Sequence, residues 1–266
     1  MEKPYGDKLY RLRVEKIWSL RPQVDGFIDF LKENLGLRRV TTSGRVLPAN
    51  TKTTINNFIA NCASEIQTRQ LSRKSIFNMD ETTIYLDSKS NYTYDQIGSR
   101  RVPAQSSGNE KTRLSVCFCA LAFGEKFRVM VIIPRVTPIK DYIPPNNVYI
   151  VYSKSGTFNE NIISNNFIER CIYPEILSKH LENSVLLLDH APCHLTRQVK
   201  DKLANCNINP IYIPKRLTNM LQPADVSWMR PIKRAFHEKW QNWFLNEEKS
   251  FTRSGNLKSP GYEKAI

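Results

Sequence analysis

The sequence predicts an α/β fold with a mixed sheet and flanking helices. Two apolar runs, 114–122 and 127–133, are separated by four residues that include Gly124, a spacing typical of an antiparallel hairpin. The run 185–188 is almost purely aliphatic, as expected of a central parallel strand that is covered on both faces. Other segments carry apolar residues at helical spacing, so strands and helices alternate along the chain.

The remaining elements follow from the same periodicities. In the first part of the chain we expect helices at 24–35 and 52–67, and then a short strand at 76–79 that ends at Asp80. Further along we expect a helix at 161–177, which Pro174 ends or kinks, a helix near 195–203 and a strand at 208–213. A last helix begins near Asp225, and a frayed tail follows from 246. Apolar residues at steps of three and four predict the last helix: Met229, Ile232, Phe236, Trp240, Trp243 and Phe244.

The charge balance narrows the class of partner. The chain has 39 Lys and Arg against 25 Asp and Glu, a formal net charge of +14. This excess favours nucleic acid first and anionic membrane second, and a merely basic protein remains an alternative. Membrane binding is not expected, because the apolar runs are short and the last helix carries Asp225 and two Trp residues suited to a core. The six cysteines contain no CxxC pair, so we expect buried free thiols.

Three aspartates stand at positions that suit a metal site. Asp80 and Asp189 each follow a predicted strand, and Asp225 precedes Met229 by four residues, which would place it on the inward-facing side of its helix. An Asp at a strand end is commonly a turn former or a helix cap, and that alternative holds for each of them taken alone. Converging carboxylates repel one another and need a cation, for which Mg²⁺ or Mn²⁺ is suited.

The blocks that contain these aspartates carry a family resemblance. Residues 76–82 (IFNMDET), 186–194 (LLLDHAPCH) and 221–225 (LQPAD) resemble the three catalytic blocks of pogo/Tigger-type DDE/DDD transposases. These belong to the mariner–pogo superfamily and are related to centromere-protein-B-like proteins. The resemblance covers about residues 24–245. It implies a ribonuclease-H-like nuclease domain in which Asp80, Asp189 and Asp225 hold metal.

The resemblance also implies a reaction and its partners. Two Mg²⁺ or Mn²⁺ ions are expected, with Asp80 bridging both, Asp189 on one and Asp225 on the other. Water would cut one DNA strand, and the freed 3′-hydroxyl would then attack target DNA. We therefore expect a nuclear DNA-binding protein that assembles as a homo-oligomer on DNA and needs no organic cofactor.

The second block departs from the family pattern. His190 stands where the family commonly has Asn, and Cys193 where a small residue is common. His190, Cys193 and His194 raise the alternative of a zinc site, which we do not expect because all three crowd within five residues without a second cluster. Glu81 is a rival to Asp80, but on a strand it would face the opposite side.

The domain organisation follows from the resemblance. It implies a remnant of a helix-turn-helix DNA-binding region with a basic arm at 1–45, a linker helix at 46–69, the ribonuclease-H-like domain at 70–245 and a polar tail at 246–266. The family's first helix-turn-helix would lie upstream of residue 1, so we expect an N-terminally truncated chain that binds DNA with little sequence preference. Candidate DNA contacts, each alternatively a solvated side chain, are Arg38, Arg39, Arg45, Lys215, Arg216, Arg230, Lys233 and Arg234.

Two functions of different class remain open at this stage. The first is an active enzyme that cuts and joins DNA strands. The second is a domesticated or decayed DNA-binding protein that keeps the fold without catalytic turnover. Intact carboxylates favour the first, and the absent upstream half favours the second. A generic nuclease with the same fold is a weaker third alternative.

Overall fold

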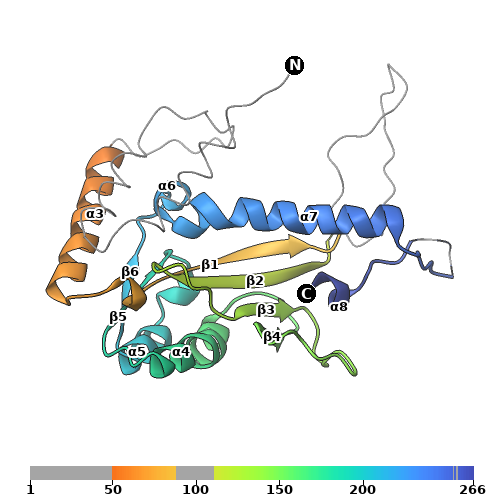
Figure 1. The fold of residues 1–266 in the computed structure, drawn as a ribbon, viewed down its shortest axis with the longest axis horizontal. Helices are drawn as coiled ribbons and strands as arrows, with labels where there is room; N and C mark the ends of the chain where they lie inside the picture. Colours follow the sequence, from red (N-terminus) through yellow and green to blue (C-terminus); the bar gives the residue numbers. More distant parts are fainter. Residues whose placement is uncertain (1–49, 88–110, 254, 256) are drawn as a thin grey trace, which may run out of the picture. The chain divides into compact units, whose positions relative to one another are not determined.

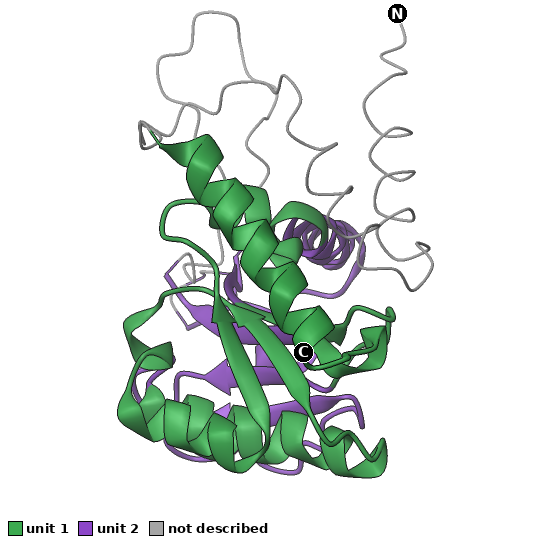
Figure 2. Ribbon diagram, turned by 90° about the vertical axis from the view of Figure 1, so that its left-hand side faces the viewer, with its two compact units in different colours: residues 1–80, 119–127, 160–227 green, residues 81–118, 128–159, 228–266 purple. Residues whose placement is uncertain are grey.

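A computed structural model describes residues 50–87, 111–253, 255 and 257–266 (Figure 1). The helix predicted at 24–35 and the arm with Arg38, Arg39 and Arg45 lie outside these residues. Among the residues described, no helix is both long and apolar enough to span a lipid bilayer. The chain divides into two compact units (Figure 2): unit 1 has the residues up to Asp80, Cys119–Phe127 and Glu160–Ser227, and unit 2 has Glu81–Phe118, Arg128–Asn159 and Trp228–Ile266.

The strands form one six-stranded mixed sheet in the order β4-β3-β2-β1-β5-β6. β5 is parallel to both of its neighbours, β1 and β6, and all of its residues are buried, so the predicted central strand is confirmed. β3 is antiparallel to β2 and parallel to β4. The strands are β1 (Ile76–Tyr85), β2 (Arg113–Leu121), β3 (Val129–Ile133), β4 (Val148–Tyr152), β5 (Ser184–Leu188) and β6 (Ile208–Tyr212).

The first three strands are antiparallel, as predicted. Two hydrogen bonds join β1 and β2 at opposite ends: Ala122 N donates to Ile76 O over 2.8 Å, and Leu86 N donates to Thr112 O over 2.9 Å. Between β2 and β3 the chain turns at Gly124, whose φ of +98° lies in the left-handed region that glycine adopts at little cost. The predicted hairpin is therefore confirmed.

Two features of the sheet differ from the prediction. β1 runs on through Thr82, Thr83, Ile84 and Tyr85, so Asp80 lies inside a ten-residue strand and not at its end. These residues are β-branched or aromatic and therefore fit a pleated strand, although they include no continuous apolar run. β4 was not predicted, because its tyrosines and its partly buried residues give a short edge strand a weak apolar pattern.

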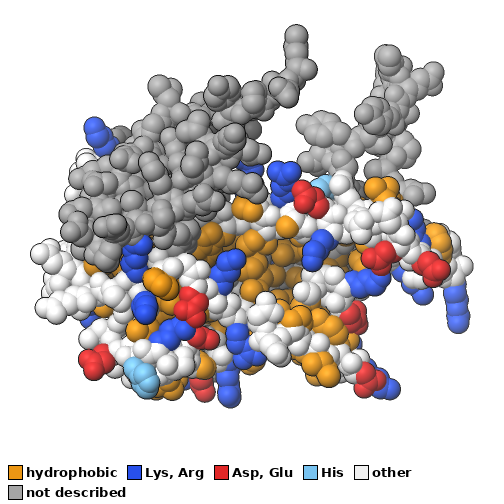
Figure 3. All heavy atoms as spheres, viewed as in Figure 1, with side chains coloured by type: hydrophobic (Ala, Val, Ile, Leu, Met, Phe, Trp, Pro, Cys, Tyr) orange, Lys and Arg blue, Asp and Glu red, His pale blue; other side chains and the backbone are white. Residues whose placement is uncertain are grey.

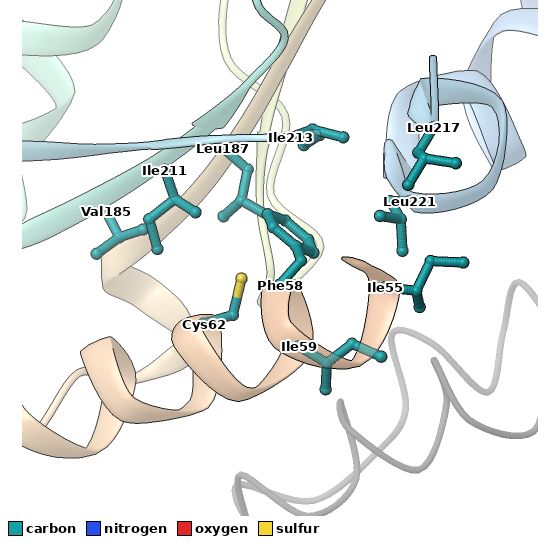
Figure 4. Close-up of a cluster of buried hydrophobic side chains, with 10 residues drawn as sticks. All are labelled: Ile55, Phe58, Ile59, Cys62, Val185, Leu187, Ile211, Ile213, Leu217 and Leu221. Atoms are coloured by element: carbon teal, nitrogen blue, oxygen red, sulfur yellow. The ribbon is translucent and has the colours of Figure 1, made fainter. Parts of the chain in front are cut away.

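The helix predicted at 52–67 is α3 (Thr51–Thr68), and it packs onto the parallel strands of unit 1. In Figure 4, Phe58 and Cys62 point from α3 toward Val185, Leu187 and Ile211 of β5 and β6. The segment expected to be a linker is therefore part of the core of unit 1. The buried cluster consists of Ile55, Phe58, Ile59, Cys62, Val185, Leu187, Ile211, Ile213, Leu217 and Leu221.

Other helices of unit 1 pack together and lie apart from α3 in Figures 1 and 2. The helix predicted at 161–177 is a π-helical segment, η2 (Ile162–Ile172), followed by α4 (Tyr173–Ser178), with Pro174 in the first turn of α4. α5 (Arg197–Asn205) is capped by Thr196, whose hydroxyl accepts from Val199 N, and is followed by β6. Unit 1 also contains the short segments η1 (Arg73–Ser75), η3 (Pro192–His194), α6 (Thr218–Leu221) and most of η4 (Ala224–Trp228).

Unit 2 has a core of its own around Leu114, Val131 and Ile133. Its long helix, α7 (Met229–Asn246), buries Met229, Trp240 and Trp243, which confirms part of the predicted stripe. Ile232, Phe236 and Phe244 of that stripe are only half-buried. The tail predicted to fray ends instead in α8 (Tyr262–Ala265), where Tyr262, Ala265 and Ile266 pack on this core. Polar residues precede this short apolar group, and for that reason the sequence pattern did not predict that it packs on a core.

All six cysteines are free, as predicted, and five of them are buried. Burial raises the pKa of the Cys62 thiol from 9.0 to about 12, because the thiolate would lose its hydration. Cys193 is the exception in being only half-buried.

We therefore expect one fast-reacting thiol in the native protein. With an aromatic disulfide reagent at pH 8, Cys193 should react in a fast phase of one equivalent, and the buried thiols should react slowly, because the thiolate is the attacking species. Stopped-flow absorbance measures the phases, and Cys193→Ser should remove the fast one. A fast phase that survives in Cys193→Ser would contradict this prediction.

Candidate active site beside the carboxyl end of β5

Asp80 is a buried carboxylate on β1, with 9% of its surface exposed. Because strand residues alternate between faces, it shares a face with Asn78, while Phe77 and Met79 lie on the other face. Phe77 packs there against Phe127, with ring centroids 5.3 Å apart. Glu81, the rival to Asp80, falls on the face opposite Asp80 by the same alternation and is half-buried.

Asp80 and Asp189 follow paired residues of two neighbouring strands. β1 and β5 run parallel, with Asn78 paired to Leu187. Asp80 lies two residues past Asn78 on β1, and Asp189 lies two residues past Leu187, just beyond the end of β5. Neighbouring strands lie about 4.8 Å apart, so the backbones at Asp80 and Asp189 lie near the same end of β5.

Asp189 is held by groups that follow it in the chain. Its Oδ1 accepts a hydrogen bond from Ala191 N over 2.8 Å and lies 2.9 Å from Nδ1 of His194, whose side chain is fully buried. Burial raises the pKa of Asp189. The hydrogen bonds from His194 and Ala191 and the charges of His194 and His190 lower it. The lowering effects are larger in sum, so the pKa of Asp189 lies below its ordinary value. Asp189 therefore carries its charge at neutral pH.

Of the two departures from the family pattern, His190 contacts Tyr212 of β6 and the residue that follows it. Nδ1 of His190 lies 2.7 Å from the carbonyl oxygen of Ile213, and its ring lies 5.4 Å from that of Tyr212. The Tyr212 hydroxyl donates to His194 O over 3.2 Å, and burial raises the pKa of that hydroxyl. Cys193 and His194 have ligand atoms within 4.8 Å of each other, and the absence of zinc from this segment stays a prediction.

Asp225 lies in η4 and is exposed. This corrects the expectation that it shares the inward-facing side of the final helix with Met229. The reason is that Ala224–Trp228 is π-helical, and its wider turn removes the four-residue spacing that would align Asp225 with Met229. The buried residues of η4 are Ala224 and Ser227, which leaves the Asp225 carboxylate at the surface of unit 1.

Two buried side-chain amides join the three blocks. Asn78 donates from Nδ2 to Leu187 O over 3.1 Å and to Gln222 Oε1 over 2.9 Å, and its Oδ1 accepts from Ala224 N over 3.1 Å. Gln222 donates from Nε2 to Met79 O over 2.7 Å. We call Asn78, Gln222 and these four hydrogen bonds the amide network. Sequence reasoning missed it, although a polar residue inside an apolar strand, two positions before Asp80, was a usable signal.

All three aspartates therefore belong to unit 1 and to segments that bond to one another. Within the described part of the chain they do not form a group whose three ligand atoms all lie within 4.8 Å of one another. The donor set fits hard divalent cations, because it consists of carboxylate oxygens and because Asp189 keeps its charge.

The candidate DNA contacts divide between the two units. Lys215 and Arg216 are exposed in unit 1, just past the end of β6, and Arg216 has a φ of +67°. Arg230, Lys233 and Arg234 are exposed on α7 in unit 2, where Arg234 pairs with Glu238. Lys and Arg side chains are spread over the face shown in Figure 3, with acidic side chains among them.

Comparison with known proteins gives consistent matches. Residues 111–266 match the family described as "DDE superfamily endonuclease", and this range contains Asp189 and Asp225. Two curated relatives, both described as "Pogo transposable element with KRAB domain", are 28% identical (Mus musculus) and 27% identical (Homo sapiens) over 183 residues, which cover 69% of this chain. The match spans only 30% of the length of either relative.

Two solved structures share the fold. The Mos1 transposase paired-end complex with left transposon end has a TM-score of 0.52 and 15% identity, and the match covers 93% of this chain and 73% of that chain. The Mos1 mariner paired-end complex with Mn gives the same values. The ribonuclease-H-like α/β fold and the pogo/mariner-type resemblance that the sequence predicts are confirmed. Since the family matches more than half of its residues, this chain belongs to the DDE superfamily endonuclease family.

Proposed function

We propose that this chain is a transposase-derived, metal-dependent endonuclease that cuts and joins DNA strands, with Asp80, Asp189 and Asp225 as the metal ligands. One observation carries the proposal. Asp80 and Asp189 each lie two residues past the paired residues Asn78 and Leu187 of two parallel strands, and the segment that carries Asp225 is hydrogen-bonded to the same two strands through Asn78 and Gln222.

The residues of the site suit a pair of divalent cations. When bound, two Mg²⁺ or Mn²⁺ ions would supply charge neutralisation at the scissile phosphate and activation of the attacking hydroxyl. Asp189 and Asp225 would hold different ions and need not approach one another closely, so a pair of ions does not require all three ligand atoms to lie within 4.8 Å of one another. Asp189 supplies an oxygen that is charged at neutral pH, since His194 and the Ala191 amide lower its pKa. The exposed carboxylate of Asp225 remains accessible from solvent.

The DNA substrate follows from the family and from the charge. The solved relatives named above are complexes with transposon ends or paired ends. Lys215 and Arg216 are exposed beyond the carboxyl end of β6, which is next to β5, so they lie at the edge of the sheet where Asp189 is. We propose that they contact phosphates near the cut, that the protein acts in the nucleus, and that it assembles as a homo-oligomer on DNA.

A plasmid-nicking assay tests the proposal. We expect the full chain to convert supercoiled plasmid to the open-circular form with Mg²⁺ or Mn²⁺, and to lose that activity with excess EDTA. Readdition of Mn²⁺ should restore it. Gel densitometry gives the rate, and Ca²⁺ serves as the control cation of equal charge. Nicking that proceeds undiminished in EDTA would overturn the proposed metal dependence.

A further inference from the structure

We infer that Asn78 and Gln222 are positioning residues that fix the three aspartates relative to one another. This inference rests on the proposed function, because it concerns the same metal site. Each bond of the amide network ends within two residues of one aspartate or on another member of the network: Met79 precedes Asp80, Leu187 lies two residues before Asp189, and Ala224 precedes Asp225.

Burial makes the amide network rigid. Gln222 is completely buried and Asn78 is 6% exposed, so water does not compete for their hydrogen bonds. The Asn78 side chain uses both its donor and its acceptor: Nδ2 donates to β5 and to Gln222, and Oδ1 accepts from the segment that carries Asp225. A side chain with only one kind of group could not make this set of bonds.

Chemistry explains why neutral amides occupy these positions. A carboxylate at either position would add a further negative charge beside three aspartates and would lose its donors. An apolar side chain would leave the Met79 carbonyl and the Ala224 amide buried without these partners. Asn and Gln are the neutral side chains that carry both a donor and an acceptor at the required reach.

The core of unit 1 supports the network from one side. Leu221 precedes Gln222 and is buried in the cluster that α3 forms with β5 and β6. Val226 N donates to Gln222 O over 3.0 Å, so the backbone of Gln222 also begins the turn that carries Asp225. The position of Asp225, an exposed residue, is therefore set by buried neighbours.

The test measures metal binding and not activity alone. Mn²⁺ is titrated into the full chain by calorimetry, and the variant Gln222→Met keeps the size of the side chain while removing its hydrogen bonds. We expect its Kd for Mn²⁺ to rise by roughly 10–100-fold, the usual effect of losing a group that orients a metal ligand. Asn78→Ala provides a second variant, and the double variant should bind no more weakly than the weaker single one, because the two residues act as one unit.

The controls separate this inference from the proposed function. Ile59→Val loosens the same core without touching the network and should bind Mn²⁺ as the unmodified chain does. If the unmodified chain and Asp189→Asn bind Mn²⁺ alike, the proposed metal site is wrong. If Asp189→Asn loses binding while folded Gln222→Met and Asn78→Ala retain the original Kd, the metal site stands and the positioning role is wrong.

Discussion

Asp189→Asn should lower metal-dependent nicking by more than roughly 100-fold, which exceeds the usual effect of changing a group that only orients a metal ligand. Asn is neutral and cannot supply the charged oxygen that Asp189 provides at neutral pH. Its side-chain oxygen can still accept from Ala191 N, so the local turn should persist. Asp80→Asn and Asp225→Asn should give losses of similar size if all three carboxylates share the metal ions.

Rates of plasmid nicking across a range of Mn²⁺ concentrations provide the measurement. Asp201→Asn is a matched control, because Asp201 is an exposed carboxylate on α5 that pairs only at 3.5 Å with Arg197. Its nicking rate should be unchanged. The melting temperature of Asp225→Asn should also stay close to that of the unmodified chain, since Asp225 is exposed. Full activity in Asp225→Asn would remove that residue from the set of ligands.

The parts of the fold that sequence could predict are those with strong local signals. The aliphatic run of β5 and the glycine turn between β2 and β3 each depend on a few adjacent residues, and both were found. The identities of the three aspartates also came from short motifs. β5 ends just before Asp189, as predicted, whereas β1 continues beyond Asp80.

The parts that sequence could not predict depend on distant contacts. The exposure of Asp225 follows from a π-helical turn, and no spacing rule based on an α-helix reproduces that. The amide network pairs Asn78 with a residue 144 positions away, so neither side chain shows its partner locally. Tyr262 and Ile266 are held at the end of the chain because they pack against a core that is built from other segments.

The affinity for DNA should depend steeply on salt, and Lys215 and Arg216 should account for part of that dependence. The +14 charge favours binding through phosphates. A protein that contacts 6–10 phosphates loses roughly 10³–10⁵-fold in affinity between 50 and 200 mM salt. Each lost phosphate contact reduces the magnitude of the negative slope of log K against log salt by about 0.9, so the double variant Lys215→Gln/Arg216→Gln should reduce that magnitude by about 1.8.

Fluorescence anisotropy with one labelled duplex at several salt concentrations measures these slopes. The matched control is Lys179→Gln/Lys202→Gln, which removes the same charge at the amino-terminal side of β5 and β6. There Lys179 pairs with Glu125 and Glu175, and Lys202 pairs with Glu169. Cations already neutralised by carboxylates release few counterions on binding, so this control should keep the original slope. Equal slopes for the two double variants would show that net charge alone, and not the position of Lys215 and Arg216 beside the site, determines DNA binding.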